Sequence, residues 1–247
     1  MGYYAKTRLG GSFTQPAKMK GERKHREEIV RCGQMLCHCG FVAAMDGNIS
    51  VRLDSRQILA TPTGMSKGRM KPADLVIVDI DGHKIAGRRE PSSELAMHRM
   101  IYRMRPDINA IVHAHPPTAT GFAAAGLAPN QPLVCEVVIG LGSIPLARYA
   151  TPGTPELCAS MEAYVPDYDA ILMANHGVVA YGEDLERAFM KMEIVEHFAK
   201  IALVTHQLGK QSPLEGEDLE KLLEARRKYA GSTSSASMPL QPAKIRE

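Results

Sequence analysis

The 247-residue sequence lacks any run of 18 uninterrupted apolar residues, so it predicts no membrane-spanning helix. Its first residues, MGYYAKTRLGG, lack the apolar stretch of a secretory signal. The five cysteines are odd in number and irregularly spaced, which favours reduced thiols over a disulfide framework. Cys37-His38-Cys39 has no second Cys/His pair at zinc-finger spacing, and a helix end with buried thiols fits it better. We therefore expect a cytoplasmic protein with no membrane partner.

The body of the sequence also lacks an excess of positive charge. The net charge is +3, but residues 1–26 carry +6 and the other 221 residues sum to −3. A folded nucleic-acid-binding domain normally carries its positive charge on the domain itself. We therefore expect no nucleic-acid partner. Neither a Walker loop nor a dinucleotide fingerprint occurs, so ATP and NAD are not implied.

No internal repeat and no long break divides the chain, which predicts one domain over residues 20–230. The polar residues 1–19 are predicted to form a flexible basic arm, and the linker-like residues 231–247 a flexible tail. Apolar periodicity and capping residues predict helices that begin near residues 22, 94, 118, 155, 185 and 216. Predicted strands cover residues 48–53, 57–61, 75–79, 110–114, 134–140, 144–147, 170–174 and 178–181. Strands in the middle with helices around them predict a layered α/β domain.

The sharpest candidate for chemistry is a pair of histidines on one predicted strand. Because side chains alternate along a strand, His113 and His115 project from the same face. His176 follows the end of a second buried strand, beside Gly177, and three neutral imidazoles leave an open position on zinc. One histidine buried in the core and one on the surface is the competing interpretation. The remaining histidines are expected at exposed positions: His25, His38, His83, His98, His197 and His206.

Polar residues at a helix start and in two loops are candidates for phosphate binding. Ser92 and Ser93 could cap the helix that follows or hold a phosphate, leaving Glu94 to face a metal. The loops at residues 47–50 and 61–64 combine Gly with Asn, Ser or Thr, which offer N–H and hydroxyl donors without bulk. Each loop by itself is also typical of an ordinary turn.

In order and spacing, these motifs resemble the class II aldolase/adducin family over about residues 22–229. The motifs that carry the resemblance are Gly-Asn-Ile-Ser-Val-Arg (47–52), Thr-Pro-Thr-Gly (61–64), Ser-Ser-Glu (92–94), His-Ala-His (113–115), Tyr-Ala-Thr-Pro-Gly-Thr (149–154) and Asn-His-Gly (175–177). The resemblance implies a three-layer α/β/α domain with a central, mostly antiparallel sheet. It also implies a homotetramer with active sites at the subunit interfaces.

The resemblance assigns roles to the candidate residues. It implies that Zn²⁺, or another divalent metal such as Mn²⁺ or Co²⁺, is bound by Glu94, His113, His115 and His176. Glu94 would also be the acid/base, and the family's epimerases have Asp in its place. The substrate phosphate would be held by Asn48, Thr63, Gly64, Ser92 and Ser93. The histidines argue for an enzyme, because the non-enzymatic adducin branch lacks them.

The expected activity is cleavage of a phosphorylated ketose, similar to fuculose phosphate, into dihydroxyacetone phosphate and an aldehyde through a metal-stabilised enediolate. Fuculose-phosphate aldolases have a tyrosine proton donor that falls on Glu136 here, whereas Tyr229 aligns with a second tyrosine of that branch. A decarboxylase, dehydratase or 4-epimerase on the same metal site, and an adducin-like interaction module, are the alternatives.

Overall fold

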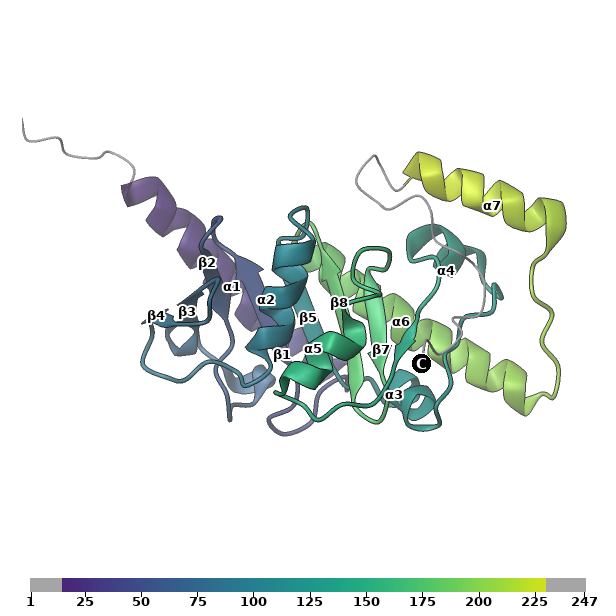
Figure 1. The fold of residues 1–247 in the computed structure, drawn as a ribbon, viewed down its shortest axis with the longest axis horizontal. Helices are drawn as coiled ribbons and strands as arrows, with labels where there is room; N and C mark the ends of the chain where they lie inside the picture. The colour runs from purple at the N-terminus through teal and green to yellow at the C-terminus, as the bar shows by residue number, and fades with distance from the viewer. Residues whose placement is uncertain (1–14, 230–247) are drawn as a thin grey trace, which may run out of the picture.

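The computed structural model describes residues 15–229, and they form one eight-stranded sheet with helices on both faces (Figure 1). The strand order is β4-β3-β2-β1-β5-β8-β7-β6, and every neighbouring pair is antiparallel except β6 with β7. The strands are β1 Asn48–Arg52, β2 Gln57–Ala60, β3 Val76–Asp79, β4 Lys84–Ala86, β5 Ala110–Ala114, β6 Leu146–Ala147, β7 Ala170–Met173 and β8 Gly177–Gly182.

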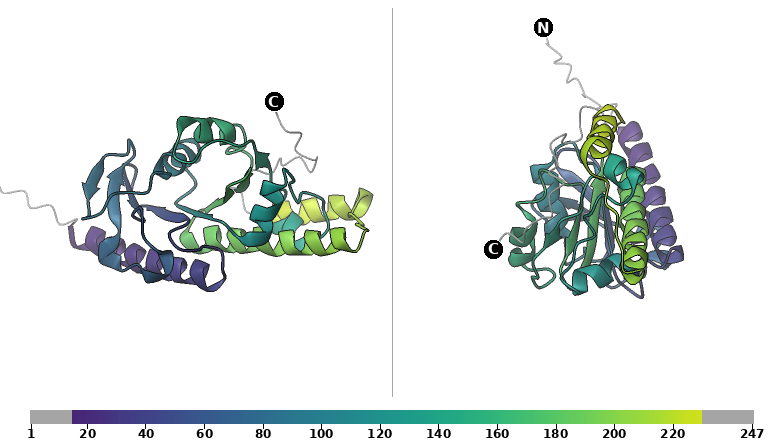
Figure 2. Two further views of the ribbon diagram at one scale, coloured as in Figure 1. Left: turned by 90° about the horizontal axis from the view of Figure 1, so that it is seen from below. Right: turned by 90° about the vertical axis from the view of Figure 1, so that its right-hand side faces the viewer.

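The helices make the two outer layers. They are α1 Gln15–His38, α2 Leu95–Met104, α3 Pro117–Ala124, α4 Cys135–Gly140, α5 Pro155–Met161, α6 Leu185–Gln207 and α7 Gly216–Tyr229, with short 3-10 turns η1 Lys67–Arg69 and η2 Pro72–Asp74. Figure 2 shows α1 and α6 along one face of the sheet and α2 and α5 on the other. The predicted three-layer α/β/α domain with a mostly antiparallel sheet is therefore confirmed.

Each face of the sheet has its own apolar core, because strand residues alternate between the faces. Ile49 and Val112 pack toward α1 and α6, whereas Ile111 and Val179 pack toward α2 and α5. Each such side chain, once fully buried, contributes about 1.5–3 kcal/mol relative to an exposed position. On the face that packs against α2 and α5, three polar side chains interrupt the apolar pattern and are themselves buried: Asn48, Ser50 and His113. These exceptions to the apolar pattern lie where the candidate site forms.

Three sequence-based expectations are wrong in detail. The strand predicted over 134–140 is helix α4, because one turn of Val-Val-Ile packs between α6 and α7 and buries Val137 and Val138. The first helix begins at Gln15, inside the predicted arm, and the thiols of Cys37 and Cys39 at its end are exposed rather than buried. Residues 1–14 and the predicted tail lie outside the described residues. None of the described helices combines the length and apolarity that a bilayer span requires.

Candidate metal centre and substrate cavity

The three histidines of the predicted metal site converge at one edge of the sheet. His113 is the penultimate residue of β5, His115 directly follows this strand, and His176 lies in the turn between β7 and β8. Asn175 adopts a left-handed conformation in that turn, with φ of 55°, which Asn tolerates better than most residues. At Gly177 an added Cβ would lie 2.5 Å from Cδ2 of His115, so only glycine lets that ring lie against the turn. The Asn-His-Gly motif is thus a local requirement of the site.

A buried carboxylate fixes the chain just beyond the histidines. Glu196 of α6 is 1% exposed and accepts hydrogen bonds from the backbone N–H groups of Thr118 and Ala119 at the start of α3, at 3.1 and 2.9 Å. Free N–H groups at a helix start favour a negative charge. The segment that follows His115 is therefore anchored to α6.

The imidazole rings face one another closely enough to share one ligand. One nitrogen from each of the three rings lies within 4.8 Å of the others. The ring centroids are 4.8–5.2 Å apart. His113 is fully buried, and the side chain of His176 is 7% exposed. The competing interpretation, in which the pair is one core and one surface histidine, does not fit this convergence.

The hydrogen bonds of the rings favour metal binding. Nδ1 of His113 donates to the carbonyl oxygen of Val178 at 2.8 Å, which leaves the lone pair of Nε2 facing the centre. Nε2 of His115 lies only 3.2 Å from that nitrogen, and the Asp46 carboxylate, 3.4 Å from Nδ1 of His115, favours the same tautomer. Two lone pairs that face each other repel, and a cation between them removes the repulsion. The donor set therefore fits a divalent metal.

The ionisation of His115 and of Glu94 also suits metal binding, which requires unprotonated ligands. Burial, reinforced by His113 and His176, lowers the pKa of His115 to about 4. Burial alone would raise the pKa of Glu94, but the neighbouring imidazoles of His113 and His176 outweigh burial and hold that pKa well below its usual range. The His115 imidazole and the Glu94 carboxylate are thus in the forms that bind a metal.

Glu94 lies immediately before α2 and reaches into the histidine cluster. Its Oε1 is 3.0 Å from Nε2 of His176, and its Oε2 is 3.3 Å from Nε2 of His113. Asn48, opposite His113 in the β1–β5 register, donates from Nδ2 to Oε2 of Glu94 at 2.9 Å. Oε1 is buried without a hydrogen bond from the described protein atoms, as expected of an oxygen that a bound metal or substrate would engage.

A cavity of about 300 Å³ opens beside this cluster. Every residue predicted to hold phosphate lines it: Asn48, Thr63, Gly64, Ser92 and Ser93. Ser92 also accepts a hydrogen bond through Oγ from the backbone N–H of Glu94, at 3.3 Å. The N-cap of α2 is Glu94 and has no side-chain cap, so the alternative role of the two serines as helix caps is wrong. Asp46 and Lys67 line the same cavity, and neither is among the site residues predicted from the sequence. No motif marked either residue.

A row of polar pairs sets the position of α2 beside β1. From the metal end outward the pairs are Asn48–Glu94, Ser50–His98 and Arg52–Tyr102. Four residues of helix rise about 6.0 Å, and two residues of strand about 6.6 Å. The steps nearly match, so all three pairs stay opposite one another and hold Glu94 in register with the sheet.

The middle pair corrects the expectation that His98 is exposed. His98 is 1% exposed, and burial lowers its pKa to about 3. Its Nδ1 lies 2.7 Å from Oγ of Ser50, which is in turn 2.9 Å from the hydroxyl of Tyr102. The spacing of Glu94, His98 and Tyr102, four residues apart each time, was the signal in the sequence that marked this polar helix face.

Glu136, one of the predicted catalytic residues, does not line the cavity. Glu136 is exposed on α4, which packs against α7 at the far end of the domain (Figure 1). Tyr229 is the last residue of α7. The structure therefore brings together the predicted metal-binding and phosphate-binding residues and leaves Glu136 outside their cavity.

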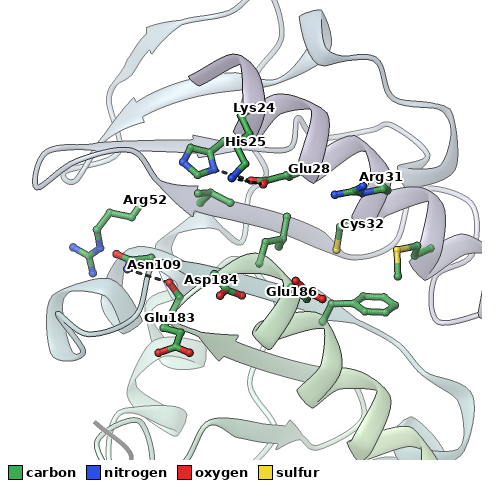
Figure 3. A pocket seen from close by; sticks show the side chains of 14 residues that line it. Lys24, His25, Glu28, Arg31, Cys32, Arg52, Asn109, Glu183, Asp184 and Glu186 are labelled. Atoms are coloured by element: carbon green, nitrogen blue, oxygen red, sulfur yellow. Dashed lines mark hydrogen bonds and ion pairs between the residues drawn. The ribbon is translucent and has the colours of Figure 1, made fainter. Parts of the chain in front are cut away.

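A larger cavity of about 720 Å³ lies between α1 and the start of α6 (Figure 3). None of the predicted site residues lines it. Several of its polar groups are already engaged in the fold: His25 contacts Glu28 at 2.9 Å, Asn109 donates to the Glu183 carbonyl at 3.1 Å, and Asp184 caps α6. The smaller cavity, with its converging ligands, is the better candidate for chemistry.

Comparisons with known proteins match this geometry. The family model described as the class II aldolase and adducin N-terminal domain matches residues 27–203. A 5-deoxy-D-ribulose 1-phosphate aldolase of Bacillus thuringiensis serovar kurstaki is 37% identical over 202 residues, covering 81% of this chain and 94% of the relative. A 3-oxo-tetronate 4-phosphate decarboxylase of Escherichia coli (strain K12) is 34% identical over 189 residues, covering 75% of this chain and 89% of the relative. The solved structure of an L-fuculose 1-phosphate aldolase superposes with a TM-score of 0.73 at 33% identity, and the match covers 81% of this chain and 94% of the solved one.

Proposed function

The chain belongs to the class II aldolase and adducin family and is a lyase, and from this premise we propose that it is a divalent-metal-dependent aldolase acting on a phosphorylated ketose. The products would be dihydroxyacetone phosphate and an aldehyde, as for a substrate similar to fuculose phosphate. The observation that carries the proposal is the convergence of three imidazoles and Glu94 beside a cavity lined by all five predicted phosphate-binding residues.

His113, His115 and His176 would hold the metal, with Glu94 beside them. We take Zn²⁺ as the resident ion, with Mn²⁺ or Co²⁺ as substitutes. When bound, the cation would polarise the substrate carbonyl and offset the negative charge that develops as the carbon–carbon bond breaks. The cavity's hydroxyl and amide donors would orient the phosphorylated end of the ketose.

Glu94 would move the proton at the carbon next to the carbonyl. Its depressed pKa makes it a carboxylate, so in the direction of bond formation it accepts the proton from that carbon. In the direction of cleavage the same carboxyl group returns the proton. Asn48 fixes the carboxylate through Oε2, which leaves Oε1 as the oxygen that faces the reacting group.

We also propose that the working enzyme is a homotetramer whose active sites lie at subunit interfaces. Glu136 and Tyr229 would then complete the cavity of a neighbouring subunit from the α4–α7 end of the domain. Of the two, Tyr229 is the candidate acid for the aldehyde oxygen. In the direction of bond formation its phenol would donate a proton to that oxygen as it becomes a hydroxyl, and in the direction of cleavage the phenolate would take that proton back.

The test is a panel of phosphorylated and free ketoses with dihydroxyacetone phosphate detected as product. We expect release of that product from at least one ketose 1-phosphate. Glu94→Gln should retain zinc yet lose exchange of the proton at the nucleophilic carbon of dihydroxyacetone phosphate in deuterated water. Normal exchange in this variant would contradict the role of Glu94 as the acid/base. Zinc below stoichiometry in the wild type would contradict the proposed metal site.

Decarboxylation is the second candidate, because one relative of 34% identity is a 3-oxo-tetronate 4-phosphate decarboxylase. Glu136, in the place of the fuculose-branch tyrosine, is the sequence departure that favours it. Carbon dioxide released from a 3-oxo acid phosphate, without dihydroxyacetone phosphate from any ketose in the panel, would select this activity instead.

A further inference from the structure

One buried lysine lies among the neutral donors of the substrate cavity. Of the described residues that line this cavity, Lys67 alone bears an ammonium or guanidinium group. Lys67 as a whole residue is 2% exposed. A buried charge is costly unless it is paired, so a lysine in such a position requires a physical explanation.

The backbone of Lys67 is held by the first helix. At Gly33 of α1 an added Cβ would lie 2.6 Å from the carbonyl oxygen of Lys67, so glycine is what allows η1 to pack this closely on α1. With its backbone fixed on the α1 side, the lysine side chain extends into the wall of the cavity. The position of the ammonium is therefore set by the fold.

The ammonium lies between the two loops that carry the predicted phosphate donors. Nζ of Lys67 donates to the carbonyl oxygen of Met45 at 2.9 Å and to that of Met65 at 2.6 Å. Met45 lies two residues before Gly47, and Met65 directly follows Gly64. An ammonium group has three N–H donors, so one remains after these two bonds.

The charge of Lys67 is not balanced by these partners. Carbonyl oxygens stabilise an ammonium but carry no counter-charge. The nearby acids, Asp46 and Glu94, oppose the effect of burial, yet burial dominates and lowers the pKa of Lys67 to about 8. Glu94 is itself committed to the histidine cluster. A further anion in the cavity would complete the pairing.

We propose that Lys67 binds the phosphoryl group of the substrate, donating its third N–H to a phosphate oxygen between the loops at residues 45–48 and 63–65. The assignment rests on the proposed function for the identity of the anion. It makes Lys67 the group that separates phosphorylated from free ketoses, since hydroxyl and amide donors serve either, whereas an ammonium favours the charged ligand. The competing explanation is that Lys67 only ties the two loops together.

The experiment measures binding of inorganic phosphate to the zinc-loaded full chain by calorimetry, without turnover. Lys67→Met removes charge and donors, whereas Lys67→Gln keeps an amide that can bond the Met45 and Met65 carbonyls but carries no charge. We expect phosphate to bind about 10- to 100-fold more weakly to both, the range for loss of a charged hydrogen bond. Arg69→Met removes one positive charge from an exposed position in the same turn and should leave binding unchanged.

Phosphate affinity in Lys67→Gln equal to that of the wild type would overturn the proposal and leave only the loop-tying role. So would a wild-type chain that binds no phosphate. If both variants fail to fold, a crystal structure of the wild type with zinc and phosphate decides: an oxygen within hydrogen-bonding distance of Nζ supports the proposal, and phosphate bound elsewhere refutes it. Lysine-dependent phosphate binding by a chain that cleaves no ketose would contradict the proposed function alone.

Discussion

Replacement of Ser50 by alanine tests whether the polar pairs between β1 and α2 hold the site together. The hydroxyl of Ser50 is the link between Nδ1 of His98, at 2.7 Å, and the hydroxyl of Tyr102, at 2.9 Å. Without it, His98 keeps no hydrogen-bond partner among the described residues, because its Nε2 already has none. Tyr102 keeps a long contact of 3.5 Å to the carbonyl of Asn109.

The magnitude follows from these contacts. A buried polar group left without a partner costs about 1–3 kcal/mol, so one complete and one partial loss give about 3 kcal/mol of unfolding free energy. For a domain of this size that lowers Tm by roughly 6–12 °C. Zinc affinity should fall as well, because Glu94 lies one helical turn from His98 and depends on the same register.

The assay is differential scanning calorimetry of zinc-loaded protein, with zinc affinity measured by competition against a chelator. Ser160→Ala is the matched control, because Ser160 is also buried but its hydroxyl only donates to the Leu157 carbonyl in its own helix, at 2.8 Å. The control should lose less than about 1 kcal/mol. If Ser50→Ala were no more destabilising than Ser160→Ala, the reasoning about the polar pairs would be refuted.

Three further predictions concern the ligands, the start of α3 and acid stability. His113→Ala should reduce zinc, measured by plasma mass spectrometry, well below stoichiometry, whereas the exposed His83→Ala should not; stoichiometric zinc in the first variant would contradict the metal site. Glu196→Gln neutralises the carboxylate that accepts hydrogen bonds from two backbone N–H groups, and it should lower the free energy of unfolding in urea by about 2 kcal/mol. A decrease below about 0.5 kcal/mol would count against that anchor. Hydrogen bonds from Arg105, the shortest 2.7 Å, hold the pKa of Asp107 below its usual 3.8. Because the folded pKa is depressed, this pair stabilises the protein above pH 3.8 and the contribution is lost as the pH falls through the folded pKa. Asp107→Asn should therefore reduce the fall of Tm as the pH drops below 3.8. An unchanged fall of Tm would contradict this contribution of Asp107 to acid stability.

Local sequence patterns were sufficient to predict the layered fold and much of the site. The strand around His113 was predicted with its observed bounds, because an apolar run ending in His-Ala-His has one clear periodicity. The short strand β4 was missed because its residues are exposed and carry no apolar signal. Residues 134–140 were predicted as a strand because Val, Val and Ile favour strands locally. Packing against α6 and α7 overrides that preference.

Sequence patterns alone were enough to identify the residue types that could form the site: three imidazoles, a carboxylate, and small donors in glycine-containing loops. They were enough because strand alternation and turn chemistry are local properties of the chain. Only the tertiary structure decided that Asn48 lies against Glu94, that His98 is buried beneath them, and that Lys67 enters the same cavity. The hydrogen bonds of these residues to Glu94, Ser50 and Met45 join positions 22 to 48 apart in the chain. Their partners are set by the register of β1 with α2 and by the close packing of η1 on α1.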